Sequence, residues 1–314
     1  MKLFTDIPCE KIAEISLSDT ICVLGSCFAD EIGSRLEAGG FNVLRNPFGT
    51  LYNPASIASA IARLDSAEPF TPADCVEMGA GAGRVGSVSH HTSFARPTAE
   101  EFLAHANARL SEDAARWRAC NRVVLTLGTA WVWRALERPG QPVVANCLKR
   151  PAREFANELL SVEACTELLR GIVEGHPDKQ FILTVSPIRH LGAGARANTL
   201  SKSTLHLAID NILSDAGRSL PDGRPGIIFR AAARKTNSGS AFPSGGVSYF
   251  PAYEIVMDEL RDYRFYAEDL VHPAPAAVQI VWERFLDACT VPAERECILA
   301  AERASRAANH RPLQ

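Results

Sequence analysis

The sequence lacks several features that would place it in a specialised class of protein. Its nine cysteines are scattered and include no C-x-x-C pair, which argues against a zinc knuckle or a disulfide framework and indicates reduced thiols. No apolar run approaches the ~20 residues of a membrane helix, since the longest, residues 123–133, is closed by Arg122 and Arg134. The first nineteen residues have no apolar stretch, so we expect no signal peptide.

An excess of charge of one sign is also lacking. The 33 Lys and Arg residues nearly balance the 36 Asp and Glu residues, which leaves a net charge of -3. This balance gives no general attraction to nucleic acid or to an acidic membrane. Hydrophobic residues make up 46% of the 314 residues, enough to form a packed core and to exclude a disordered chain. We therefore expect a soluble, cytoplasmic protein without a nucleic-acid or membrane partner.

Strand-like and helix-like segments alternate along the chain. Apolar residues at helical spacing follow Ser26, and candidate N-caps at Asn53, Thr98 and Ser161 begin further helices. This alternation predicts a three-layer α/β fold with a mainly parallel sheet. We expect one domain over residues 1–314, a Gly-rich insertion or β-hairpin at about 65–97 and a helical tail at about 292–314. The expected strands are residues 20–24, 41–44, 122–127, 180–185 and 226–230, with extended chain at 87–94, and the expected helices include 151–174 (with a break), 198–213, 253–260 and 273–288.

Ser26 is a candidate nucleophile because it lies between the first strand and the first helix. In a parallel sheet, active sites lie beyond the carboxyl ends of the strands, and a helix N-terminus can stabilise an oxyanion. A serine needs an adjacent base, and the Asp–x–x–His spacing of Asp269 and His272 lets one turn present a carboxylate and an imidazole together. The structural alternative is that Ser26 caps its helix and that Asp269 and His272 cap the next one.

Cys27 is a rival nucleophile. A thiol at the start of a helix has a lowered pKa and could also pair with His272. Because one position of a strand–turn–helix elbow faces the cleft, we expect Ser26 to face it and Cys27 to turn toward the base of the helix.

Other polar residues follow strands or lie in loops near them. We expect His91 or His190 to hydrogen-bond a substrate or a loop, and Arg189 either to bind an anionic substrate group or to form a surface ion pair. The histidine and cysteine spacings match no zinc motif. The G-x-G-x-x-G string at residues 81–86 lacks a surrounding βαβ unit. We therefore expect no metal and no organic cofactor.

Several stretches of the chain resemble the GSCFA family, which is named after the string Gly25-Ser26-Cys27-Phe28-Ala29. The resemblance extends from about residue 21 to residue 285. The family is similar to the SGNH (GDSL-like) hydrolases, which have a flavodoxin-like three-layer fold. It therefore implies that Ser26 is the nucleophile, His272 the base and Asp269 the carboxylate that orients the base. The other matching stretches are NPFGTLYN at 46–53, TLGTAW at 126–131, ANC at 145–147, VSPIRH at 185–190 and parts of 249–273.

The resemblance also implies an oxyanion hole. SGNH enzymes use the N–H of the serine, a glycine in a second block and an asparagine in a third block. Ser26 and Gly49 supply the first two, but the third block reads GTAW at residues 128–131 and has no asparagine. Thr129, Asn146, His91 or a backbone N–H are the candidate replacements.

Together these patterns predict an acyl-ester hydrolase or O-acyltransferase of the SGNH type. The resemblance suggests an O-acetylated carbohydrate as the first substrate to test. Two alternatives remain open at this point: a catalytically silent protein that binds a carbohydrate or peptide in the same cleft, and a thiol-dependent hydrolase that uses Cys27.

Overall fold

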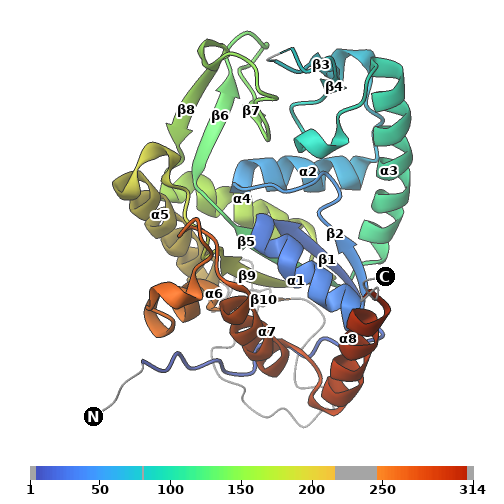
Figure 1. Ribbon diagram of the computed structural model, residues 1–314. Coiled ribbons are helices and arrows are strands. Elements are labelled where there is room, and N and C mark those ends of the chain that lie inside the picture. Colours follow the sequence, from blue (N-terminus) through green and yellow to red (C-terminus); the bar gives the residue numbers. More distant parts are fainter. Residues whose placement is uncertain (1–4, 80, 216–245, 310–314) are drawn as a thin grey trace, which may run out of the picture.

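A five-stranded parallel sheet lies at the centre of the computed structural model, which describes residues 5–79, 81–215 and 246–309 (Figure 1). The strand order is β10-β9-β5-β1-β2, and every neighbouring pair is parallel. In order along the chain this is 2-1-3-4-5, the flavodoxin-like arrangement, in which the order reverses between β1 and β5. The strands are β1 (Thr20–Gly25), β2 (Asn42–Arg45), β5 (Arg122–Leu127), β9 (Gln180–Val185) and β10 (Gly246–Tyr249).

Four of these strands lie where the sequence predicted them. The fifth expected strand, residues 226–230, lies outside the described residues. β9 pairs with β5 on one side and with β10 on the other, and β10 was not predicted from the sequence.

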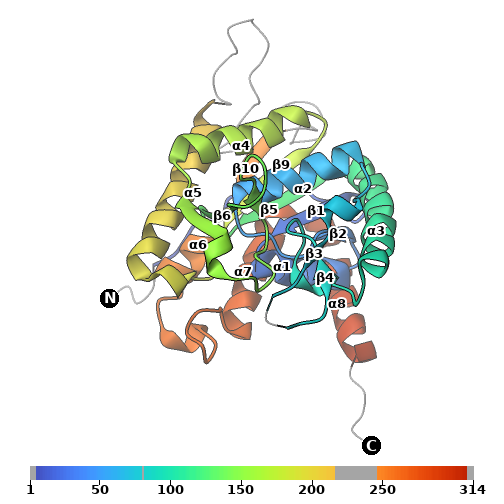
Figure 2. The ribbon, with the colours of Figure 1, turned by 90° about the horizontal axis from the view of Figure 1, so that it is seen from above.

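Helices cover both faces of the sheet, which confirms the three-layer α/β prediction (Figures 1 and 2). One face is covered by α2 (Pro54–Ser66), α3 (Ala99–Ala119), α4 (Val162–Gly175) and α5 (Ala195–Asp215). The other face is covered by α1 (Cys27–Ala38) and α7 (Pro275–Cys289), with α8 (Arg295–Asn309) beside α1.

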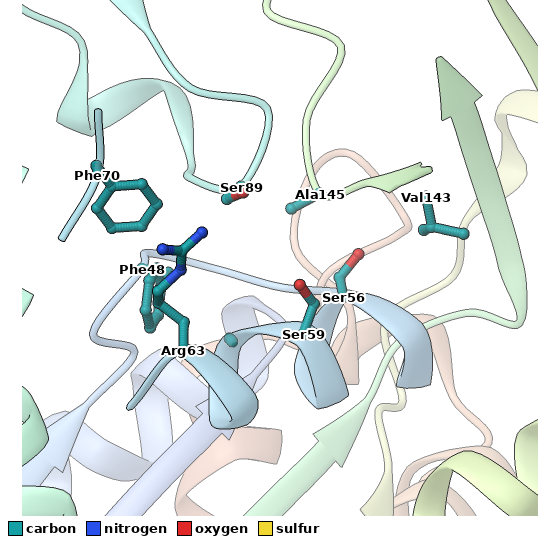
Figure 3. A pocket seen from close by; sticks show the side chains of 9 residues that line it. Phe48, Ser56, Ser59, Arg63, Phe70, Ser89, Val143 and Ala145 are labelled. Carbon is teal, nitrogen blue, oxygen red and sulfur yellow. The ribbon is translucent and has the colours of Figure 1, made fainter. Parts of the chain in front are cut away.

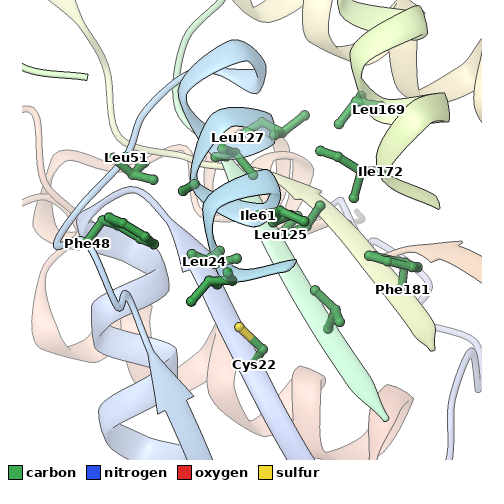
Figure 4. Packing of buried hydrophobic residues seen from close by; sticks show 14 of the residues in the cluster. Cys22, Leu24, Phe48, Leu51, Ile61, Leu125, Leu127, Leu169, Ile172 and Phe181 are labelled. Carbon is green, nitrogen blue, oxygen red and sulfur yellow. The ribbon is translucent and has the colours of Figure 1, made fainter. Parts of the chain in front are cut away.

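Alternation along the strands divides the core between the two faces. Cys22 and Leu24 of β1 pack with the first helical layer, part of which Figure 4 shows. Ile21 and Val23 point the other way and pack with the second layer. Because both faces are covered, the central strands are apolar throughout, as buried parallel strands are.

Side-chain caps begin the helices at the positions that the sequence predicted. Asn53 Oδ1 accepts a hydrogen bond from Ser56 N at 2.8 Å, and Pro54 occupies the first helical position. Thr98 and Ser161 cap α3 and α4 in the same way, each at 3.1 Å. The helix predicted over residues 253–260 consists of the short α6 (Ala252–Glu254) and a π turn (Ile255–Glu259).

Two small antiparallel sheets lie above α2 and α4 in Figure 1. One joins β7 (Val143–Val144), β6 (Trp131–Ala135) and β8 (Phe155–Leu159), and the other joins β3 (Val76–Glu77) and β4 (Val85–Gly86). The helix predicted over residues 151–174 is therefore wrong in its first part, because β8 pairs with β6 there. Residues 87–94 were expected to be extended, but they form a loop that ends in a 3₁₀ turn, Thr92–Phe94.

None of the described helices has both the length and the apolar character to cross a membrane. The remaining short elements of the fold are 3₁₀ turns. The turns are Pro72–Asp74, Ala152–Glu154, Leu191–Ala193, Tyr263–Phe265 and Pro292–Glu294.

Candidate active site

A sharp elbow, residues 25–27, joins the end of β1 to the start of α1. Gly25 has φ +142°, and a Cβ atom there would lie 2.1 Å from the carbonyl oxygen of Thr126 on β5. Glycine is therefore required for β1 and β5 to pair at this point. Ser26 follows as the N-cap of α1, and its hydroxyl accepts a hydrogen bond from Phe28 N at 3.3 Å. Its side chain is almost covered, with 1% of the residue exposed.

One tight turn holds the predicted base and carboxylate together. His272 Nδ1 lies 2.6 Å from Asp269 Oδ2, while Asp269 Oδ1 accepts hydrogen bonds from the N–H groups of Val271 and His272, both at 2.9 Å. These two backbone hydrogen bonds and the contact with the His272 side chain lower the pKa of Asp269 to about 2. The ionised carboxylate thus accepts a hydrogen bond from the N–H at Nδ1, which leaves the lone pair of His272 on Nε2.

The turn is closed at its base and exposed at its tip. Ala267 N donates to His272 O at 2.8 Å, and Leu270 adopts a left-handed φ of 55°. About half of each of the Asp269 and His272 side chains is accessible to solvent. The His272 imidazole is therefore held firmly but remains accessible from outside.

The structure brings Ser26 and His272, from opposite ends of the chain, to one cavity of about 220 Å³. The cavity lies at the carboxyl ends of β1 and β9, next to the reversal of strand order between β1 and β5. Among the hydrogen bonds of the described residues, none joins Ser26 Oγ to His272, because the hydroxyl caps α1 instead. The lining residues are Ser26, Cys27, Tyr52, Ile188, Arg189, His190, Val271 and His272.

Cys27 also lines the cavity, and its side chain is exposed. The expectation that Cys27 turns toward the base of the helix is therefore wrong. Its Sγ lies 3.5 Å from the hydroxyl of Tyr52, which in turn lies 3.3 Å from Thr50 Oγ1. Burial raises the pKa of Tyr52 to about 12, so this phenol stays neutral and can donate a hydrogen bond into the cavity.

His190 and Arg189 form a second wall of the cavity. Burial, assisted by the charges of Lys202 and His272, lowers the pKa of His190 to about 4, so its ring is neutral near pH 7. Its Nε2 is buried without a hydrogen-bond partner, and the ring packs edge-on against Tyr52 with centroids 5.4 Å apart. Arg189 places its guanidinium over the ring of Tyr266 at 5.4 Å and takes part in none of the ion pairs found among the described residues.

The structure does not bring the other predicted oxyanion groups to this cavity. Gly49 N donates to Asn46 O at 2.7 Å, and Gly49 packs against His91, where an added Cβ would lie 2.3 Å from that of the histidine. Thr129 Oγ1 pairs with Ser201 Oγ at 2.9 Å. Asn146 is engaged in its own loop, where its Oδ1 accepts from Leu148 N at 2.8 Å. His91 caps the 3₁₀ turn that follows it, where its Nδ1 accepts from Ser93 N at 3.3 Å, and it does not line the cavity either.

The backbone donors of the elbow are arranged differently from the prediction. Ser26 N already donates to Thr126 O at 3.2 Å across the strands. The N–H of Cys27, the first of α1, has no partner among the described residues. A free N–H at a helix start favours a negatively charged ligand atom there.

Two residues near the site were missed by the sequence analysis. Tyr52 lies in the stretch 46–53 that resembles the family, but only the fold shows that its hydroxyl reaches Cys27. Lys202 lies beneath the cavity in α5, and a lysine in a helix carries no signal that it is buried.

Other cavities of the described residues lie away from the elbow, among them one beside α2 and one between the two small sheets. The cavity beside α2 is lined by Ser56, Ser59, Arg63 and Phe70, with Ser56 Oγ lacking a partner (Figure 3). Its volume of about 40 Å³ suits a few water molecules, each of which needs at least ~10–15 Å³, rather than an organic substrate. The other is a groove of about 430 Å³ between the two small sheets, where Arg150 pairs with Glu154 at 2.5 Å.

No three His, Cys, Asp or Glu side chains of residues 5–79, 81–215 and 246–309 come together as a metal site.

Comparison with known protein families finds a match to the GSCFA family over residues 20–222 and 227–285. The matched region includes the elbow as well as the turn that carries Asp269 and His272. The chain matches no curated protein and no solved structure.

Proposed function

The chain belongs to the GSCFA family, and from this premise we propose that it is a serine-dependent hydrolase of carboxylic esters, or an O-acyltransferase, of the SGNH type. One observation carries the proposal: Ser26 and the Asp269-bound imidazole of His272 line the same cavity at the carboxyl edge of the sheet. A hydroxyl, an imidazole with a free Nε2 and an orienting carboxylate are the groups that acyl transfer requires.

In the first step the Ser26 hydroxyl leaves its capping position and attacks the ester carbonyl. Its proton passes to His272 Nε2 as the Oγ–C bond forms, and Asp269 stabilises the imidazolium. The resulting oxyanion accepts a hydrogen bond from the free N–H of Cys27, at the positive end of α1. The Tyr52 hydroxyl lies beside the same position and can act as a second donor.

The second half of the reaction reverses these proton transfers. His272 gives its proton to the leaving alcohol as the C–O bond of the ester breaks, which leaves an acyl group on Ser26. Water or a second alcohol then loses a proton to His272 as it attacks, and the acyl group is released as an acid or as a new ester. An O-acetylated carbohydrate is the first substrate to test, because the cavity of about 220 Å³ has room for only a small acyl group.

The test is a panel of p-nitrophenyl esters with the wild-type protein and three variants. We expect Ser26→Ala and His272→Ala to lower kcat by at least about 10³-fold and Cys27→Ala to retain activity, because removal of a triad member has effects of this size. A fluorophosphonate should leave its adduct on Ser26, as located by mass spectrometry. Loss of the N-cap costs only about 1 kcal/mol, so Ser26→Ala should stay folded. A folded wild-type protein that hydrolyses no ester would contradict the proposal.

A thiol-dependent acyl transfer is the second candidate, and the exposure of Cys27 favours it. Its Sγ faces the cavity while the Ser26 hydroxyl is almost covered. If Cys27 is the nucleophile, iodoacetamide will abolish ester hydrolysis, Cys27→Ser will be nearly inactive and the Ser26→Ala variant will keep its activity.

A further inference from the structure

Lys202 is a buried lysine directly beneath the candidate site. Only 2% of the residue is exposed, and its Nζ donates to Gly128 O at 2.6 Å and to Ser186 O at 2.7 Å. These carbonyls lie one residue beyond the ends of β5 and β9. No carboxylate pairs with Lys202 among the ion pairs of the described residues. Burial of an ammonium without a counter-charge is costly, so an apolar residue would be expected here if packing were the only requirement.

Gly128, whose carbonyl accepts a hydrogen bond from Lys202, lies next to three residues that line the cavity. An added Cβ at Gly128 would lie 3.1 Å from His190 Nε2, 3.1 Å from Tyr52 O and 3.4 Å from Ser26 Cβ. A shift of Gly128 would therefore displace all three of these residues. The second carbonyl belongs to Ser186, which precedes the segment that carries Arg189 and His190 into the cavity.

We propose that protonated Lys202 is the positioning residue of the site. Its first role is to join the ends of β5 and β9 by its two hydrogen bonds, and its second role is to place a positive charge behind Ser26, where the oxyanion forms. The second part of this inference rests on the proposed acyl transfer, while the first part does not. The ionisable groups that sense this charge are His190, in the loop after β9, and His206, on α5, whose Nδ1 lies 3.7 Å from Glu254.

The chain offers a matched control at the opposite edge of the sheet. Lys179 is 3% exposed and also holds two carbonyls, Cys120 O at 2.7 Å and Trp117 O at 3.1 Å. It directly precedes β9, at the amino end of the strands. Lys179→Met removes two carbonyl contacts as Lys202→Met does, together with an ion pair to the exposed carboxylate of Asp178 at 3.4 Å, but far from the cavity.

The first experiment does not depend on any catalytic activity. The side-chain pKa values of the histidines are measured by NMR in the wild type, Lys202→Met and Lys179→Met. We expect the pKa of His190 to rise in Lys202→Met and to stay unchanged in Lys179→Met, because the charge of Lys202 helps to lower the pKa of His190 and Lys179 does not contribute to it. An unchanged pKa of His190 in a folded Lys202→Met variant would overturn the inference. The pKa of His190 can be measured even if the protein hydrolyses no ester. The absence of hydrolysis would contradict the proposed function but not the role of Lys202 at the ends of β5 and β9.

The second experiment separates the effect on catalysis from an effect on folding. For an effective dielectric of about 20, one charge at a distance of ~12 Å is worth ~1.4 kcal/mol, so its loss predicts that kcat falls at least about tenfold in Lys202→Met, with KM unchanged. Lys202→Arg should restore most of kcat, and Lys179→Met should change stability alone. Equal effects of the two Met variants on kcat would show that Lys202 is only structural.

If Lys202→Met does not fold, the wild-type protein provides the decisive measurement. Because burial lowers the pKa of Lys202 to about 7, the side-chain ¹⁵N signal of Lys202 should report an ammonium over the range from about pH 5 to about pH 7. A neutral amine throughout that range would overturn the proposal.

Discussion

Replacing Gly25 with alanine should force β1 away from β5 where the elbow begins. The new Cβ would lie 2.1 Å from the oxygen and 2.9 Å from the carbonyl carbon of Thr126. Both obstacles are backbone atoms of a buried strand, so no side chain can rotate to make room. The φ of +142° is strained for any residue except glycine.

The expected cost follows from two contributions. Overpacking in a dense core costs about 1–3 kcal/mol, and a backbone conformation reserved for glycine costs about 1–3 kcal/mol more. We therefore expect Gly25→Ala to lower the free energy of unfolding by about 2–6 kcal/mol. This is a large part of the ~5–15 kcal/mol that a protein domain has. The separation of the strands should also break the hydrogen bond from Ser26 N to Thr126 O.

Urea denaturation of Gly25→Ala beside Gly140→Ala tests this reasoning. Gly140 also has a positive φ, +73°, but an added Cβ there meets no atom within 4 Å. Its replacement should cost only about 1 kcal/mol of backbone strain. Equal losses in the two variants would refute the argument, since the close approach of β5 would then contribute nothing.

Three further predictions concern the site and the helix that follows it. Asp269→Asn should lower kcat about 10²–10⁴-fold in an ester-hydrolysis assay while His272 stays in place, because the amide favours the wrong tautomer; full activity would contradict this. Burial lowers the pKa of Lys202 to about 7, below its unfolded value, so the unfolded chain binds the extra proton between about pH 7 and 10.5. Stability measured by urea denaturation should therefore rise across this range, and Lys202→Met should remove that slope. Asn53→Ala should cost about 1 kcal/mol in the same assay, because it removes the hydrogen bond to Ser56 N, and an unchanged midpoint would argue against this cap.

The parts of the fold that the sequence predicted are those with strong local signals. The buried runs that become β1, β5 and β9 are long and apolar, and Asn53 and Ser161 carry the side chains that a helix start requires.

The parts that were missed depend on distant contacts. β10 has only four residues, too few to show a period, and its pairing with β9 defines it. In β8, pairing with β6 overrides a composition that also suits a helix.

The same distinction between local signals and distant contacts applies to the residues of the candidate site. Ser26 and the Asp269–His272 turn could be found because a motif and a short spacing carry them. The contact of Tyr52 with Cys27 and the burial of Lys202 could not, because both arise from packing between segments far apart in the sequence. Cys27 was misplaced because the direction of a side chain at an elbow depends on how the helix leaves the sheet.

The two parts of the site are held in place by different interactions. Hydrogen bonds within residues 267–272 assemble the acid–base pair, so that pair can persist when the surrounding layers loosen. The hydroxyl and the thiol, in contrast, keep their places only while β1 and β5 stay joined at Gly25. Mild heating should therefore separate the Asp269–His272 turn from the Ser26–Cys27 elbow at a temperature below that of global unfolding. This separation should reverse on cooling.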